Sequence, residues 1–254
     1  MNKSVVAAQL YTLRDFTKTE ADISNTFERV SKIGYKAVQI SALGKIEPSD
    51  LRKIADRNDL QIVASHISYD LITTDVRKVI DDHKILGCRH VAIGGLPTDF
   101  RNQDGFYRFA REASEAVKPI IDAGLTFSYH NHSFELEKFG HRTGLDILVE
   151  ESDPDYFSFE IDTYWIQHGG ANPVSCLKRL KDRMHIVHLK DMSMEGTKQL
   201  FAEVGEGNLE WEPILAACRD ANIEWYIIEQ DICTGDPFDS LEISKNNLGE
   251  MGLI

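Results

Sequence analysis

The sequence predicts a single closed (β/α)₈ barrel, and three observations lead to this expectation. Short apolar runs rich in branched and aromatic residues recur eight times, as expected of parallel strands buried on both faces. Segments with helical periodicity separate these runs, and several end at a glycine just before the next run. The chain has 254 residues, and eight such units closed into a barrel typically need about 250.

The eight predicted strands alternate with predicted helices along the whole chain. They are "VVAAQLYT" (5–12), "AVQIS" (37–41), "QIVASH" (61–66), "HVAIGG" (90–95), "LTFSYHN" (125–131), "YFSFEID" (156–162), "MHIVHLKD" (184–191) and "WYIIEQD" (225–231). This alternation indicates a parallel sheet with helical crossovers. A doubly wound open sheet is the competing architecture, but no G-x-G-x-x-G motif follows the first strand.

The segment 19–34 illustrates how the helices are predicted. Its apolar residues recur at spacings of four, three and three, which places them on one helical face, and Gly34 follows as a stop. These residues are Ile23, Phe27, Val30 and Ile33. The segment 106–124 repeats the pattern and ends at Gly124 before the fifth strand. Linkers and low-complexity segments are not evident, so residues 1–254 are predicted to form one domain.

Composition narrows the classes of function. The net charge is −13, from 28 basic and 41 acidic residues, which argues against a broad nucleic-acid or anionic-membrane surface. No apolar run approaches the roughly 18 residues of a membrane helix, and the first residues lack the features of a secretory signal. The four cysteines contain no C-x-x-C pair, so we expect reduced thiols and a cytoplasmic protein. They are Cys88, Cys176, Cys218 and Cys233.

Polar residues gather where the predicted strands end, and in a barrel of this kind the carboxyl ends of the strands carry the chemistry. The candidates are Gln9, Tyr11 and Arg14 on the first strand, His66 on the third, His130, Asn131, His132 and Glu135 after the fifth, Asp162 on the sixth, His188, Lys190 and Asp191 on the seventh, and Glu229 and Asp231 on the eighth. Four consecutive strands that end in metal-binding residue types favour a metal site over independent helix caps.

Period-two alternation brings Asp162, His188 and Glu229 to one mouth of the barrel for one choice of face on each strand. Converging carboxylates repel one another, and a divalent cation removes that repulsion. Carboxylates with one imidazole suit Mn²⁺, our first choice, or Mg²⁺, Co²⁺ or Zn²⁺. The fourth ligand is expected from the fifth strand or its loop.

Glu135 is the first choice for this fourth ligand because it completes a shell of three carboxylates and one histidine. His130 and His132 are its rivals. Each candidate also has a purely structural interpretation. An Asp at a strand end most often caps the next helix, Asp231 can open the turn that follows it, and Asp191 is better explained as a cap or an orienting residue than as a ligand.

Five motifs together resemble the xylose isomerase-like barrels, and more narrowly their sugar phosphate isomerase/epimerase group. They are "YHNHSFEL", "IDTYW" with "GGANP", "HIVHLKD", "VGEGNLEW" and "IIEQD". The resemblance implies a metal held by Glu, Asp, His and Glu from four successive strand ends. Asp162, His188 and Glu229 match the last three. The fifth strand departs from the pattern, because Ser128 stands where many epimerases have the Glu, and Glu135 is the expected replacement.

The resemblance implies a divalent-metal-dependent isomerase, epimerase or lyase that acts on a sugar, keto-sugar or cyclitol. Such an enzyme abstracts a proton beside a carbonyl and forms an enediolate. The candidate catalytic residues are Glu135, Glu229, His132 and His130. The candidate substrate-binding residues are His66, Trp165, Lys190, Arg14 and Asp231. The Gly-rich segment 204–211 is interpreted as a loop near the site.

The partners expected are a small sugar or cyclitol and, as is common among similar proteins, further copies of the chain, with neither nucleic acid nor membrane. Two alternatives remain at the level of sequence. One is a DNA-repair enzyme like endonuclease IV, which would need further metal ligands and a basic DNA-facing surface. The other is a sugar-binding barrel that has lost its activity.

Overall fold

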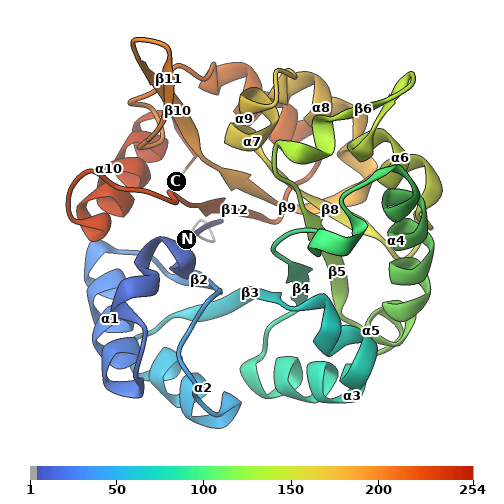
Figure 1. Cartoon of the computed structure of the whole chain (residues 1–254). Helices are drawn as coiled ribbons and strands as arrows, with labels where there is room; N and C mark the ends of the chain where they lie inside the picture. The colour runs from blue at the N-terminus through green and yellow to red at the C-terminus, as the bar shows by residue number, and fades with distance from the viewer. Residues whose placement is uncertain (1–4, 254) are drawn as a thin grey trace.

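The computed structural model describes residues 5–253, so residues 1–4 and 254 of the predicted domain lie outside it. Eight parallel strands close into a barrel (Figure 1), which confirms the predicted fold class. The barrel strands are β1 (Val6–Gln9), β2 (Ala37–Ile40), β3 (Gln61–Ile67), β4 (His90–Ile93), β5 (Thr126–His130), β8 (Ser158–Asp162), β9 (Met184–Leu189) and β12 (Trp225–Ile228). Neighbours in the barrel follow chain order, and β12 closes it against β1.

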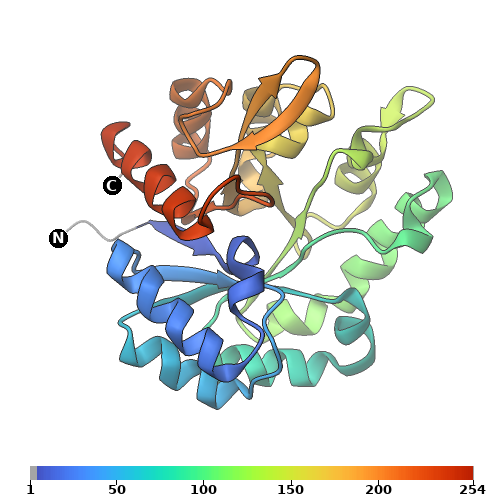
Figure 2. The ribbon, with the colours of Figure 1, turned by 60° about the vertical axis from the view of Figure 1, so that its left-hand side comes forward.

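The α-helices surround the barrel (Figures 1 and 2) and connect its strands. They are α1 (Glu20–Ile33), α2 (Pro48–Arg57), α3 (Tyr69–Leu86), α4 (Gln103–Ala116), α5 (Lys118–Asp122), α6 (Gly144–Glu151), α7 (Thr163–His168), α8 (Pro173–Arg179), α9 (Trp211–Asp220) and α10 (Pro237–Glu250). In the described part of the chain, none of these helices combines the length and the apolar character that a membrane crossing requires.

Two details of the connections differ from the sequence prediction. The first predicted strand, 5–12, already ends at Gln9, because a 3₁₀ helix, η1 (Leu10–Phe16), begins there. The helix predicted over 106–124 is two helices, α4 and α5, because Pro119 has no N–H to continue the hydrogen-bond ladder and instead occupies the first turn of α5.

Two small hairpins were not predicted. β6 (Lys138–Phe139) pairs with β7 (Arg142–Thr143), and β10 (Asp191–Glu195) pairs with β11 (Lys198–Ala202). Each follows the carboxyl end of a barrel strand, β5 or β9, and extends outward from the barrel (Figure 2). The remaining short elements are the 3₁₀ helices η2 (Thr98–Phe100), η3 (Phe134–Leu136) and η4 (Lys181–Arg183).

The apolar core has two parts, and the smaller one fills part of the barrel lumen, which limits where a polar site can lie. The larger part lies between the helices and the outer face of the barrel. The smaller part fills the lumen with Ala7, Ala37, Val63, Ala64, Ile186, Trp225 and Ile227. Nearer the carboxyl ends of the barrel strands, buried polar residues appear, among them Gln9, Gln39 and Glu160. The lumen therefore contains an apolar layer, and it is polar at the carboxyl ends of its strands.

Candidate metal and active site

Asp162 ends β8 and begins α7, and its two carboxylate oxygens have different partners. Oδ1 accepts a hydrogen bond from the backbone N–H of Trp165 at 3.0 Å, so Asp162 is the N-cap of α7. Oδ2 faces the barrel mouth, 3.2 Å from Nε2 of His130 and 3.0 Å from Nζ of Lys190. The capping role and a role in the site are therefore compatible, because each uses its own oxygen.

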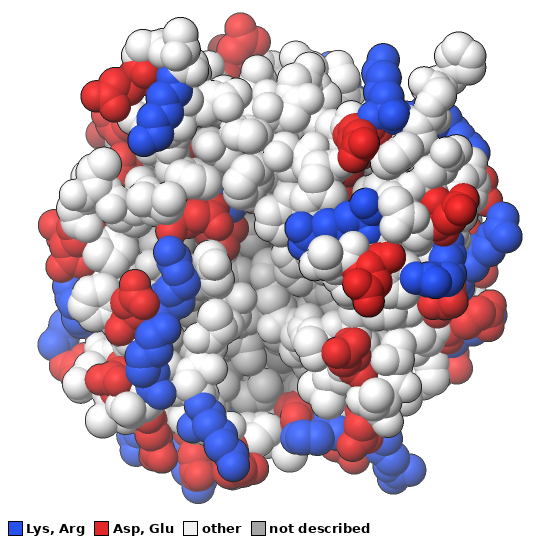
Figure 3. All heavy atoms as spheres, viewed as in Figure 1, with Lys and Arg blue, Asp and Glu red and all other residues white. Residues whose placement is uncertain are grey.

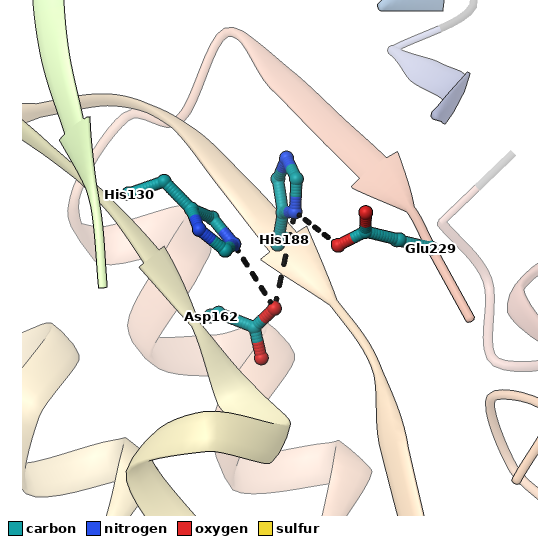
Figure 4. Close-up of side chains that lie close together, drawn as sticks. All are labelled: His130, Asp162, His188 and Glu229. Atoms are coloured by element: carbon teal, nitrogen blue, oxygen red, sulfur yellow. Dashed lines mark hydrogen bonds and ion pairs between the residues drawn. The ribbon is translucent and has the colours of Figure 1, made fainter. Parts of the chain in front are cut away.

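The structure brings Asp162, His188 and Glu229 together with His130 (Figure 4). Each of the four side chains offers a ligand atom, and these atoms lie within 4.8 Å of one another. Nδ1 of His188 is 3.0 Å from Oε2 of Glu229 and 3.9 Å from Oδ2 of Asp162. All four residues are buried. Two carboxylates and two imidazoles suit a divalent transition metal, so the donor set fits such an ion. The nitrogen of His130 that lies beside Asp162 is Nε2, and its Nδ1 is buried without a hydrogen-bond partner in the described part of the chain.

Glu135 lies outside this four-residue group. It is fully buried, and its carboxylate accepts hydrogen bonds from the hydroxyl of Tyr129 at 2.5 Å and from the backbone N–H of His132 at 2.9 Å. Burial raises the pKa of Glu135 to about 7. In this position Glu135 fixes the loop after β5. The member of the group that comes from β5 is His130, the rival named from the sequence.

Lys190 lies in the middle of the acidic residues and is completely buried. Its Nζ is 3.0 Å from Oδ2 of Asp162, 2.7 Å from Oε2 of Glu229 and 2.6 Å from Oδ2 of Asp231. Burial opposes the charge of Lys190, but the three carboxylates raise its pKa well above the ordinary value. Lys190 and Asp231, both predicted to bind substrate, are thus paired with each other and with the ligand candidates.

Below this group lies a second buried layer built around Glu160, to which the sequence analysis assigned no function. Its Oε2 is 2.7 Å from Nε2 of His66, and its Oε1 accepts a hydrogen bond from Nε2 of Gln39 at 2.8 Å and lies 2.9 Å from Nε2 of His188. His66, predicted to contact substrate, is therefore held by Glu160. A charged residue inside the apolar run "FSFEID" was the sequence signal for this layer.

The charges of the two layers depend on one another through His188. Burial disfavours the imidazolium, but Glu160 and Glu229 raise the pKa of His188 to about 10. Burial raises the pKa of Glu160, and the nearby His188 and His66 more than reverse this effect, so its pKa lies well below the ordinary value. His188 thus connects the carboxylates of the mouth with the floor of the site.

An aromatic surface borders the group on the side of α7. The ring centroids of Trp165 and His132 are 5.2 Å apart, and Nζ of Lys190 lies 5.5 Å from the ring of Trp165 and 5.8 Å from that of Phe201. Nδ1 of His132 and Nε1 of Trp165 are buried and have no hydrogen-bond partner among the described residues. Burial, and then the neighbouring His130, lower the pKa of His132 to about 3. The surface therefore combines an apolar wall with free polar atoms.

Two glycines at the end of β4 leave space for the imidazoles. A Cβ at Gly94 would lie 3.0 Å from Nδ1 of His66, and a Cβ at Gly95 would lie 3.0 Å from Cε1 of His132. Both distances are tighter than ordinary contacts. The "IGG" sequence after the fourth strand is thus a close-approach feature of the site.

Arg14 lies at the rim. Its guanidinium donates to the backbone oxygens of Tyr11, at 3.0 Å, and Asp231, at 2.8 Å. A cavity of about 240 Å³ adjoins it, lined in part by Thr12, Asp231 and Cys233. Figure 3 shows the face seen in Figure 1: it is hollowed at its centre and carries acidic and basic side chains interspersed around the hollow. This face offers no continuous basic surface.

Asp191 organises the Gly-rich loop after the β10–β11 hairpin. Its carboxylate accepts five hydrogen bonds, from the indole of Trp211 at 2.6 Å and from four backbone N–H groups, and the residue is completely buried. The four N–H groups belong to Met192, Gly205, Gly207 and Leu209. Asp191 is therefore an orienting residue for this loop, as the sequence analysis favoured.

Comparison with known proteins supports this picture of the barrel. Residues 27–242 match the family described as the xylose isomerase-like TIM barrel. Among curated proteins, the inosose dehydratase of Geobacillus kaustophilus is 21% identical over 87% of this chain and 85% of its own length. The inosose dehydratase of Mesomycoplasma hyopneumoniae is 26% identical over 89% of this chain and 87% of its own.

Solved structures show the same fold. A sugar phosphate isomerase/epimerase from Parabacteroides distasonis superimposes with a TM-score of 0.82 at 21% identity, covering 98% of this chain and 99% of its own. An L-ribulose 3-epimerase superimposes with a TM-score of 0.74 at 13% identity, covering 99% and 95%. These similarities extend over essentially the whole barrel.

Proposed function

The chain belongs to the xylose isomerase-like TIM barrel family, and on this basis we propose that it is a divalent-metal-dependent isomerase, epimerase or lyase. Its substrate is a sugar, keto-sugar or cyclitol. The observation that carries the proposal is the buried group of His130, Asp162, His188 and Glu229 at the carboxyl ends of four neighbouring barrel strands. Similar proteins named as inosose dehydratases and as an epimerase support this class of reaction.

These four residues are the proposed ligands, and Mn²⁺ is the proposed ion. A cation bound there would polarise the substrate carbonyl and lower the energy of the enediolate formed when the adjacent carbon loses its proton. Carboxylate and imidazole groups bind Mn²⁺ readily, and they also bind Mg²⁺, Co²⁺ and Zn²⁺ with different affinities. Reconstitution with each metal in turn tests the identity of the ion.

His132 is the proposed proton acceptor. Its Nδ1 has no hydrogen-bond partner in the described part of the chain, so this atom is open to a substrate proton. The lowered pKa of His132, about 3, keeps the imidazole neutral at pH 7, which is the form that a base requires, and makes it a weak base. The other candidates have other tasks: Glu229 and His130 belong to the proposed metal ligands, and Glu135 is bonded to Tyr129. Geometry therefore favours His132 among the residues predicted to carry the proton.

Trp165 and Phe201 are proposed to form the wall on which the sugar or cyclitol ring lies. Their rings border Lys190 at 5.5 and 5.8 Å, so an ammonium and an apolar face are presented side by side. Lys190 would then hold an oxygen of the substrate or of its leaving group. Return of the proton to the same carbon from the other face gives epimerisation, return to the neighbouring carbon gives isomerisation, and loss of a leaving group gives elimination.

The test is deuterium uptake from D₂O into a panel of ketoses, inososes and 3-keto-glycosides. Protein depleted of metal with EDTA is reconstituted with Mn²⁺, Mg²⁺, Co²⁺ or Zn²⁺ before each assay. We expect metal-dependent exchange at the carbon beside the carbonyl in the wild type and its loss in Asp162→Asn. The matched control is Asp81→Asn, an exposed residue of α3 with the same chemical change.

The alternative functions give different results in the same preparations. Cation binding without exchange into any substrate of the panel would indicate an inactive sugar-binding barrel. Binding and cleavage of abasic DNA at low salt would indicate a repair enzyme, although the mixed charges on the face in Figure 3 and the net charge of −13 argue against this outcome.

A further inference from the structure

The ammonium group of Lys190 occupies the place where two proposed metal ligands converge. Its Nζ contacts Oε2 of Glu229 at 2.7 Å and Oδ2 of Asp162 at 3.0 Å. Those residues also belong to the group whose ligand atoms lie within 4.8 Å of one another. Lys190 itself is completely buried, so water does not solvate its charge.

A divalent cation and this ammonium cannot use the same oxygens at the same time. Metal–oxygen bonds are about 2.0 to 2.2 Å long for small divalent ions, so a cation bound to Asp162 and Glu229 would lie within a few ångströms of Nζ. Two positive charges that close repel strongly in a buried site, where the effective dielectric constant is low. One of them must give way.

A third carboxylate offers Lys190 a place to go. Oδ2 of Asp231 is 2.6 Å from Nζ, closer than either of the other two carboxylates, and Asp231 does not belong to the ligand group. Its side chain is 22% exposed, whereas those of Asp162 and Glu229 are almost inaccessible. Asp231 therefore lies on the solvent side of the ammonium and can keep it when the inner contacts are lost.

We propose that Lys190 is an internal competitor of the divalent cation, which neutralises Asp162 and Glu229 until the cation displaces it onto Asp231. The inference rests on the proposed function, since it concerns the same ligands. It gives Lys190 two tasks: it sets the affinity of the site for metal, and it compensates two buried carboxylates when no cation is bound. A protein of this kind stays folded without its metal.

The first experiment measures Mn²⁺ affinity by isothermal titration calorimetry for the full-length wild type and for Lys190→Met. Methionine keeps an unbranched side chain, one heavy atom shorter than that of lysine, and removes its charge. We expect the Mn²⁺ affinity of Lys190→Met to be higher than that of the wild type by a factor of about ten or more, because the cation no longer has to displace an ammonium group. The matched control is Lys53→Met in α2, an exposed lysine whose loss changes the net charge equally and should leave the affinity unchanged.

A second measurement separates competition from a merely structural role. In EDTA, Lys190→Met leaves buried carboxylates uncompensated, so its thermal midpoint should fall below that of the wild type. Saturating Mn²⁺ should then raise the midpoint more in the variant than in the wild type. A lysine needed only for packing would lower the midpoint with and without Mn²⁺ alike, and that result would overturn the inference.

A crystal structure of the wild type grown with Mn²⁺ tests the inference without any variant, which matters if Lys190→Met does not fold. We expect Nζ to have left Asp162 and Glu229 and to remain at Asp231. Nζ still bonded to both inner carboxylates beside a bound ion would overturn the inference while leaving the proposed function intact. Failure of the wild type and of Lys190→Met to bind any divalent cation would contradict both.

Discussion

The hydroxyl of Tyr129 lies 2.5 Å from Oε1 of Glu135, and both residues are completely buried. The second oxygen of Glu135 accepts from the backbone N–H of His132. Glu135 thus joins β5 to the loop that carries His132. This relationship gives the glutamate a structural task that a metal ligand could not perform at the same time with the same two oxygens.

Replacement of Glu135 by glutamine should therefore leave Mn²⁺ affinity unchanged within about threefold, since the amide can accept from His132 while its NH₂ donates to Tyr129. Calorimetric titration checks this. If Glu135 were a ligand, loss of its charge would weaken Mn²⁺ binding by about tenfold or more. Asp81→Asn again serves as the control for the removal of one negative charge.

The same substitution should change how stability depends on pH. Burial raises the pKa of Glu135 from 4.5 to about 7, so the folded state holds a proton that the unfolded state releases between these values. Stability should fall as the pH rises through this range, and the wild type should lose about 2 to 3 kcal/mol more than Glu135→Gln between pH 5 and pH 8. Urea unfolding of both proteins at the two pH values measures the difference. An identical pH dependence would contradict the assignment.

The buried imidazole of His90 should make stability depend on pH in the opposite direction, at acidic pH. It is buried at the amino end of β4, hydrogen-bonded through Nδ1 to Thr126 at 2.8 Å, and burial lowers its pKa from 6.5 to about 4. Between these values the unfolded state binds a proton and the folded state does not, so stability should fall as the pH falls. We expect the wild type to lose about 2 to 3 kcal/mol more than His90→Asn between pH 7 and pH 4.5. Urea midpoints that shift equally would show that His90 does not carry the effect.

Two substitutions of Asp162 separate its role as the N-cap of α7 from its proposed role as a metal ligand. Asn keeps an oxygen that can cap α7, whereas Ala does not. Both variants should lose Mn²⁺ binding, but Asp162→Ala should be less stable than Asp162→Asn by about 1 kcal/mol. Calorimetry and urea unfolding give the two readouts. Retained Mn²⁺ affinity in the asparagine variant would exclude Asp162 as a ligand.

The loop held by Asp191 provides a test of the surroundings of the site. The carboxylate of Asp191 accepts five hydrogen bonds in a fully buried position. Asp191→Asn places an NH₂ group against these donors and should lower the free energy of unfolding by about 2 to 4 kcal/mol. Urea unfolding measures the loss, and faster amide exchange confined to residues 203–209 would locate it. Asp182→Asn, at an exposed position, is the matched control. An unchanged urea midpoint would mean that the loop does not depend on this carboxylate.

Gly207 tests the same contact from the other side. A Cβ at this position would lie 2.3 Å from Oδ1 of Asp191 and 2.6 Å from the backbone oxygen of Met192. Gly207→Ala should therefore destabilise the protein by about 1 to 3 kcal/mol. Gly235→Ala, where a Cβ meets nothing within 4 Å, should change the free energy of unfolding little. Equal thermal midpoints for the two variants would contradict the close packing of this loop.

Much of the fold follows from local patterns. Runs of branched apolar residues, helical periodicity and glycine stops predicted all eight barrel strands, and only their limits shifted, as at Gln9. The short hairpins after β5 and β9 were missed because segments of two to five residues carry too little periodicity to identify. The sequence does not predict a role for Glu160, because its partners His66 and Gln39 come from strands about a hundred residues away.

The sequence by itself determined that the chain is a (β/α)₈ barrel whose last strands end in Asp162, His188 and Glu229, because strand periodicity and the chemistry of strand ends are local properties. Only the tertiary structure decided that His130 and not Glu135 joins them, and that Lys190 is enclosed by their carboxylates. The physical reason is that the direction of a side chain beyond the end of a strand depends on the path of the loop and on the register of the neighbouring strands. Those are set by contacts between distant parts of the chain.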